Sequence, residues 1–170
     1  MKNLNKNRVF RFNRRIRGLT NYKLRLGLLK SGLTRAVVRM SNNNMLVQFV
    51  DYGDDGDKIL TSVKSNELKK LGYTLNTGNT VSAYLAGMLA GKKLLKSKKG
   101  SSEVIIDMGL QQSFYGGRIY AAIKGLVDAG VNVKVSDVVF PVEERLTGAH
   151  LKQDDAEKVV AKVKATIEAM

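Results

Sequence analysis

The sequence of 170 residues contains no cysteine, one proline and one histidine, His150. Without cysteine it can form neither disulfides nor thiolate metal sites, and a lone histidine is poor support for zinc or catalysis. We therefore expect a surface or packing role for His150. No apolar run approaches the roughly 20 residues that cross a bilayer, and the amino terminus has no apolar signal-peptide core. These absences predict a soluble intracellular protein without a metal, a cofactor or a membrane partner.

Acidic residues are absent from the first 50 positions, which hold 12 lysines and arginines. Residues 51–170 hold 17 basic and 15 acidic residues, so the net charge of +14 is concentrated at one end of the chain. Exposed like charges repel one another, and surface ion pairs stabilise a fold little. A solvated basic face is therefore a poor explanation for this block, and binding of an external anion is a better one.

Residues 1–19 show no apolar period that would hold a helix or a strand, and we interpret them as an arm that becomes ordered on its partner. From Thr20, a predicted N-cap, Tyr22, Leu26 and Leu29 share one helical face, which predicts a short helix docked on the domain up to Ser31-Gly32. Cations would contact phosphates, and aromatic rings such as that of Tyr22 would stack on unpaired bases. The candidate cations are Arg8, Arg11, Arg14, Arg15, Arg17, Lys23, Arg25 and Lys30.

The rest of the chain predicts an α/β fold with a mixed sheet. Three antiparallel strands are expected at 35–40, 45–51 and 58–64, with turns at 41–44 and 52–57. Helical patterns follow at 65–71, 80–96 and 117–130, with a buried parallel strand at 103–109 between the last two. We expect a basic arm over 1–19, an α/β domain over 20–150 and a C-terminal amphipathic helix within 151–170.

Two further groups are candidate contacts within the domain. Arg35 and Arg39 alternate along the first strand, so one face should present both of them. A predicted helix follows Tyr115, Gly117 and Arg118, and the N-terminus of a helix attracts anions. An arginine at this place can donate two hydrogen bonds to one phosphate. A flexible connection with a capping arginine is the alternative interpretation of this second group, which lacks the Gly-Lys-Ser of a nucleotide loop.

The carboxylates do not form a pattern that indicates catalysis. The acidic segment 51–57 lacks ligands at two positions of a calcium loop and is better explained as a hairpin turn. Asp107 is predicted on a buried strand without the companion carboxylates that metal-dependent phosphoryl chemistry requires, so we expect it to be structural.

Several blocks in order resemble a known family. RRIRGLTNYKLRLGLLKSG at 14–32, RAVVRMSNNNMLVQFVDY at 35–52 and VIIDMGLQQSFYGGRIYAAIKGLVDAG at 104–130 are similar to the universal large-subunit ribosomal protein numbered eighteen, in its archaeal and eukaryotic form. The resemblance covers roughly residues 8–150. It implies a ribonuclease-H-like sheet without the catalytic carboxylates of the nuclease, and therefore a structural protein rather than an enzyme.

The resemblance also implies partners and contacts. The partners would be 5S rRNA, large-subunit rRNA and neighbouring large-subunit proteins in the central protuberance of the cytoplasmic ribosome. RNA contacts of the family correspond to Arg14, Arg15 and Lys23, to the hairpin turn at Ser41 and Asn42, and to the Gly117-Arg118 turn. Asn43 of the same hairpin turn is a further candidate contact. A nucleic-acid hydrolase and a free DNA-binding module are the alternatives. Clustered carboxylates would favour the first and a groove-reading helix the second, and neither is evident.

Overall fold

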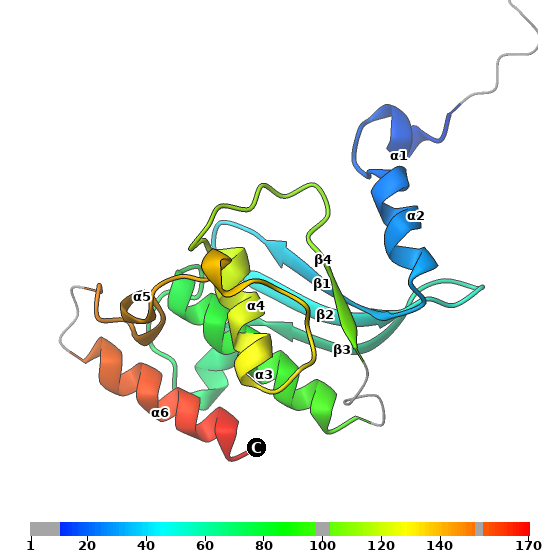
Figure 1. Cartoon of the computed structure of the whole chain (residues 1–170). Helices are drawn as coiled ribbons and strands as arrows, with labels where there is room; N and C mark the ends of the chain where they lie inside the picture. The colour runs from blue at the N-terminus through cyan, green and yellow to red at the C-terminus, as the bar shows by residue number, and fades with distance from the viewer. Residues whose placement is uncertain (1–10, 98–102, 152–154) are drawn as a thin grey trace, which may run out of the picture.

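The computed structural model describes residues 11–97, 103–151 and 155–170 (Figure 1). Their centre is a four-stranded sheet with the order β3-β2-β1-β4. Its strands are β1 (Thr34–Met40), β2 (Met45–Asp51), β3 (Lys58–Lys64) and β4 (Val104–Asp107). β2 pairs antiparallel with both β1 and β3, whereas β4 pairs parallel with β1. The predicted mixed sheet is therefore confirmed, and the three antiparallel strands begin and end within one residue of their predicted bounds.

A bulge interrupts the pairing of β2 with β3. Phe49 lies opposite Thr61 and Val50 lies opposite Ile59, so Leu60 is an extra residue on β3. Bulges of this kind bend a strand and strengthen its twist.

One face of the sheet is covered by helices α3 (Thr80–Leu95) and α4 (Arg118–Asp128), with α5 (Glu143–Thr147) and α6 (Ala156–Glu168) beyond them. Alternate side chains of the sheet point into this layer and are fully buried: Ala36, Val38, Val47, Phe49 and Val63. Complete burial of a large apolar side chain stabilises a fold by roughly 1.5–3 kcal/mol. The domain core therefore lies on this side of the sheet.

Helices α3 and α4 approach each other closely because each has a glycine facing the backbone of the other. A Cβ atom added at Gly87 would overlap the carbonyl of Ala122, and one added at Gly125 would overlap the carbonyl of Tyr84. At this crossing, glycine permits backbone-to-backbone packing.

The opposite face of the sheet carries Arg35, Val37 and Arg39 of β1 and Asp107 of β4, because these residues alternate with the core-facing ones. No helix of the described chain packs across this face. Helices α1 (Asn13–Ile16) and α2 (Tyr22–Lys30) extend from one end of the sheet, away from α3 to α6 (Figure 1). This arrangement leaves the basic end of the protein accessible.

The remaining elements differ partly from the prediction. The helical pattern at 65–71 is a 3-10 helix, η1 (Ser65–Leu71), which ends at Gly72 with a φ of 90°. The predicted C-terminal helix is confirmed as α6, which buries Val160, Val163 and Ile167 at helical spacing. Two short elements, η2 (Asp137–Val139) and α5, have too few residues to show a period and were not predicted. No helix within the described ranges is long and apolar enough to span a bilayer.

Candidate nucleic-acid interface

The described part of the basic arm contains one helical turn, α1, where the sequence predicted no regular structure. The carbonyl of Phe12 accepts hydrogen bonds from the N–H groups of Arg15 and Ile16, and Arg14 Nε donates to Thr20 Oγ1 at 2.6 Å. Local polar contacts therefore fold the turn without an apolar period, and none of its residues is buried. Thr20 is not the N-cap of the next helix, because Asn21 Oδ1 accepts the N–H of Leu24 in that role.

Helix α2 projects from the domain. No residue of α2 is buried, and Leu26 and Tyr22 on the predicted docking face are 55% and 38% exposed. The prediction that this face packs on the domain is therefore wrong. Leucines at 24, 26, 28 and 29 surround the helix, so their spacing does not define one apolar side. Instead, Leu24, Arg25 and Leu28 line a cleft between the helix and the sheet.

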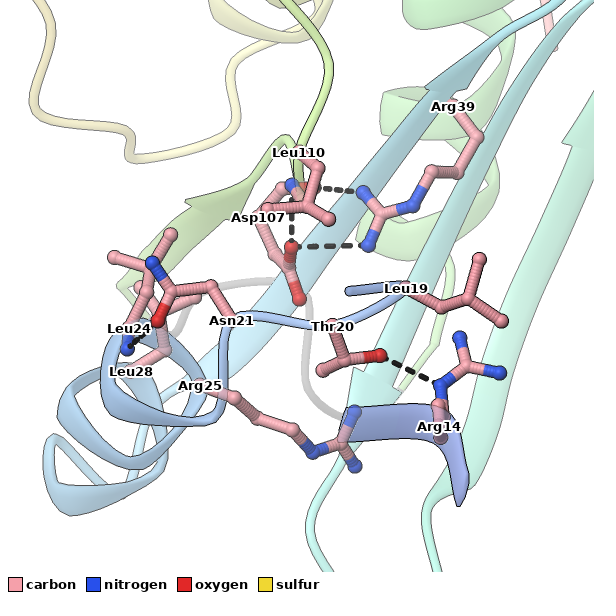
Figure 2. A pocket seen from close by; sticks show the side chains of 11 residues that line it. Arg14, Leu19, Thr20, Asn21, Leu24, Arg25, Leu28, Arg39, Asp107 and Leu110 are labelled. Atoms are coloured by element: carbon pink, nitrogen blue, oxygen red, sulfur yellow. Dashed lines mark hydrogen bonds and ion pairs between the residues drawn. The ribbon is translucent and has the colours of Figure 1, made fainter. Parts of the chain in front are cut away.

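This cleft, of about 140 Å³, brings cations together from three elements (Figure 2). Arg14 comes from α1, Arg25 from α2 and Arg39 from β1. Leucine side chains, including Leu19 and Leu110, complete the wall. Asp107 is the one carboxylate in the lining, and its charge is offset by two arginines. The cleft therefore has the charge and the donors that suit an anionic group such as a phosphate.

Asp107 has the structural role that its position predicted. Its Oδ1 lies 3.0 Å from Arg39 Nη2, its backbone carbonyl accepts a hydrogen bond of 2.6 Å from Arg39 Nη1, and its Oδ2 lies 3.4 Å from Arg35 Nη1. Oδ1 also accepts the N–H of Gly109 at 2.9 Å. These contacts fix Arg39 over the end of β4, with its side chain 37% exposed toward the cleft.

Arg35 is buried, although the strand pattern placed it on the same presenting face as Arg39. Only 1% of the residue is exposed, and its Nη2 lies 2.8 Å from Asp57 Oδ2. The same oxygen lies 2.8 Å from Arg25 Nη2 of α2. Partial burial raises the pKa of Asp57, but the adjacent guanidiniums of Arg35 and Arg25 outweigh this effect and hold the pKa below its usual value. The prediction that both strand arginines are presented is therefore wrong for Arg35.

The hairpin turn between β1 and β2 forms a second exposed group. Ser41, Asn42 and Asn43 are exposed, and the turn is closed by the N–H of Ser41 donating to the carbonyl of Asn44 at 2.8 Å. Thr77 Oγ1 donates to the carbonyl of Asn43 at 2.9 Å, which ties the tip to the segment before α3. The turn therefore presents polar side chains from a fixed backbone.

Arg118 fastens this turn to the domain. Its Nη1 lies 3.2 Å from the carbonyl oxygens of Ser41 and Asn42 and 2.7 Å from that of Gly78. One Nη atom has two hydrogens, so three acceptors must share them. This nitrogen is engaged by protein carbonyls, which agrees with the alternative, structural interpretation of Arg118.

The loop before α4 exposes two aromatic rings. Tyr115 is 77% exposed and packs edge-on against Tyr120, with ring centroids 6.4 Å apart, while Gly117 is the N-cap of α4. Phe114 is 70% exposed and was not among the predicted contacts, although it adjoins Tyr115 in the sequence. The rings extend the hairpin group with surfaces on which bases can stack.

Helix α2 continues the basic segment 1–19, and the two together are called the arm below. The remaining candidate cations of this arm lie outside the cleft lining. Those in the described chain are all exposed: Arg11, Arg15, Arg17, Lys23 and Lys30. Arg8 lies outside the described residues. None of the described cations in this set has a carboxylate within ion-pair distance.

The other motifs do not form a reaction centre. The segment 52–57 is a turn, closed by the N–H of Gly56 donating to the carbonyl of Gly53 at 3.0 Å, and Asp57 is occupied by arginines. Across the described residues, no three His, Asp or Glu side chains are placed to hold a metal ion. His150 is exposed, as expected, with its Nδ1 3.3 Å from the carbonyl of Glu144.

The basic end of this α/β domain presents exposed guanidiniums without carboxylate partners. This charge distribution is typical of nucleic-acid-binding proteins. Residues 6–104 match the family described as "Ribosomal large subunit proteins 60S L5, and 50S L18". The chain is also similar to "Large ribosomal subunit protein uL18" of Methanothermobacter thermautotrophicus, with 39% identity over 142 residues, which are 84% of this chain and 73% of the relative. The chain belongs to this family of large-subunit ribosomal proteins.

Membership of the family settles the broad class of function. The protein is a structural constituent of the large ribosomal subunit, located in the cytoplasm, and not an enzyme. The resemblance that the sequence blocks indicated is therefore confirmed.

Proposed function

We propose that this protein binds 5S rRNA and helps to attach it to large-subunit rRNA in the central protuberance, beside neighbouring large-subunit proteins. The observation that carries the proposal is that Arg14, Arg25 and Arg39 converge on the cleft between α2 and the sheet, beside an arm that contains no carboxylate. Neutralising phosphates is the physical use of cations arranged in this way, because each contact releases counterions from the nucleic acid.

In this proposal the arm supplies most of the phosphate contacts. The exposed cations of α1, α2 and the segment before them follow the RNA backbone, and Arg39 meets it from the sheet. Phe12 and Tyr22 are 80% and 38% exposed beside these cations and stack on unpaired bases. The contacts proposed for this surface are Arg8, Arg11, Arg14, Arg15, Arg17, Tyr22, Lys23, Arg25, Lys30 and Arg39.

The hairpin tip and the loop before α4 form a second surface. Ser41, Asn42 and Asn43 offer hydroxyl and amide groups to ribose and phosphate, and Tyr115 and Gly117 offer a ring and a close backbone approach. Arg118 holds the hairpin for these contacts through the carbonyl groups that it already binds. Arg35 acts in the same indirect way, because its guanidinium is buried and lies against Asp107, which lines the cleft.

A competition experiment tests the proposal. Labelled 5S rRNA is titrated with the full chain at fixed salt, and unlabelled 5S rRNA or duplex DNA of equal length is added as competitor. We expect 5S rRNA to compete at least tenfold more effectively, because splayed bases and RNA shape offer contacts that a regular duplex lacks. Equal competition by the two nucleic acids would contradict the proposal, since charge alone would then explain the binding.

A further inference from the structure

The arm is joined to the domain by little apart from its connecting segment. Helix α2 ends with Ser31 as its C-cap, and Gly32 follows with a φ of 67° before β1 begins at Thr34. No side chain of α2 is buried. A helix of nine residues attached in this way can swing about its connection unless a specific contact holds it.

An alternating chain of charges provides such a contact. Asp57 Oδ2 lies 2.8 Å from Arg25 Nη2 of α2 and 2.8 Å from Arg35 Nη2 of β1. Arg35 lies in turn against Asp107, which holds Arg39. Three cations and two carboxylates therefore alternate from α2, through the loop before β3, to β1 and the edge strand β4.

The middle of this chain is fixed and its ends are open. The Arg35 side chain is 2% exposed, and it is anchored within the sheet between β2 and β4. The side chains of Arg25 and Arg39 at the two ends are 40% and 37% exposed, and both line the cleft. A guanidinium has five N–H donors, so each end retains donors beyond those used for its carboxylate.

We propose that Asp57 is a positioning residue that fixes the angle of α2 against the sheet, by joining Arg25 to the buried Arg35. The inference rests on the proposed RNA binding for its consequence, because a fixed arm presents Arg14, Arg25 and Arg39 to phosphates at set separations. The geometric part can be tested without RNA.

The expected effect on affinity follows from the population of the competent orientation. Apparent affinity is the intrinsic affinity multiplied by the fraction of molecules in that orientation. If loss of the Arg25–Asp57 contact leaves about a tenth of the arms correctly placed, RNA affinity falls about tenfold beyond the loss of one charge.

The absence of cysteine permits a direct measurement of the arm angle. Spin labels are attached to the full chain carrying Leu26→Cys on α2 and Lys70→Cys on η1, at two exposed positions, and their separation is measured by pulsed electron resonance. A second pair, Lys70→Cys with Lys162→Cys on α6, reports on the domain alone. Each pair is examined in the parent, in Arg25→Gln, in Asp57→Asn and in Lys23→Gln. The last variant removes a charge from the same helix at an exposed position with no described ion pair.

We expect the arm pair to give a narrow distance distribution in the parent and in Lys23→Gln, and a broad one in Arg25→Gln and Asp57→Asn. The domain pair should stay narrow throughout. Arg25→Gln is the decisive variant, since it leaves Asp57 paired with Arg35, whereas Asp57→Asn removes a partner from a buried guanidinium and can unfold the domain. Binding of 5S rRNA should then weaken about tenfold more in Arg25→Gln than in Lys23→Gln.

An unchanged arm distribution in Arg25→Gln would overturn the positioning role. Equal RNA affinity of Arg25→Gln and Lys23→Gln, despite a broadened arm, would also overturn it, because the angle would then have no consequence for binding. A parent protein without preference for 5S rRNA would contradict the proposed function instead, and the distance distributions would still decide whether Asp57 positions α2.

Discussion

Replacing Arg14, Arg15 and Arg17 together by glutamine tests the arm most directly. The three guanidiniums belong to α1 and its C-cap, none of them is buried, and none has a carboxylate partner in the described chain. Arg14 Nε bonds to Thr20 Oγ1 and the other two project into solvent. All three are therefore free to neutralise phosphates, and their removal should leave the domain core unaltered.

The magnitude follows from the number of cations. Each phosphate contact contributes roughly 0.7 to 0.9 to the slope of log affinity against log salt concentration, by analogy with single strands and B-DNA. Three contacts correspond to about two units of slope, so a fourfold rise in salt should weaken binding of the variant about 16-fold less than that of the parent. The thermal midpoint should change by less than about 2 °C, because exposed substitutions alter stability by at most a few tenths of a kcal/mol.

The assay is fluorescence anisotropy with labelled 5S rRNA at four or more salt concentrations. Lys69, Lys70 and Lys162 provide the matched control, since they are three exposed cations on η1 and α6, away from the arm. Their replacement by glutamine should barely alter the slope. An equal flattening in both triple variants would refute the reasoning, because net charge rather than the position of the arm would then govern binding.

Three further predictions concern the domain. Gly125→Ala should lower the free energy of unfolding by about 1–3 kcal/mol, because the added Cβ would overlap the backbone of α3 and lie 2.7 Å from the Met88 nitrogen. An unchanged denaturation midpoint would contradict the close packing. Arg118→Met removes the charged donor shared by three carbonyls, and it should lower the free energy of unfolding by about 1.5–3 kcal/mol. Amide hydrogen exchange in the 41–44 turn should become faster. Unchanged exchange would show that the contact does not fix the turn. Burial raises the pKa of Tyr73 to about 12, whereas its pKa in the unfolded chain is about 10. The stability that this group contributes is therefore fully present below about pH 10 and is lost as the pH rises to about 12. The loss amounts to at most about 2.7 kcal/mol. Tyr73→Phe should therefore reduce the loss of stability between pH 10 and 12 in denaturant titrations, and a loss of the same size in both proteins would exclude this cause.

The sheet could be predicted because its signal is local. Strands β1, β2 and β3 are short runs rich in β-branched residues, each bounded by Gly, Asn or Asp turns, and these features fix where a strand begins and ends. Helices α4 and α6 have apolar residues at a clear helical period and were predicted for the same reason. The family resemblance added the function but was not needed for this architecture.

The failures arose where distant residues decide the outcome. Alternation along β1 identifies the face of the sheet on which Arg35 lies. It does not show that Asp57 and Asp107 lie against Arg35, and Asp107 is 72 residues away in the sequence. Leucines on several sides of α2 cannot show which side faces the domain, and the structure shows that none is buried. Thr20 and Asn21 are both good capping residues, so choosing between them requires the backbone geometry. The cations of the interface could thus be named from the sequence, whereas their grouping into a cleft could not.

The bulge at Leu60 determines which charge meets Arg35. Side chains on a strand point alternately to its two faces, so an inserted residue exchanges the faces for everything on one side of it. Thr61 and Val63 lie on the helix-covered face, whereas Ile59 lies opposite Val50 and shares the face of Arg35. Asp57, two residues before Ile59, follows the same alternation and reaches Arg35 and Arg25. If Leu60 instead lay opposite Val50 in a regular register, every residue before it would shift by one position and Lys58 would replace Asp57. An ammonium would then stand between two guanidiniums. The pairing register of the edge strand β3 therefore decides whether the charge that faces Arg25 attracts the arm to the sheet or repels it.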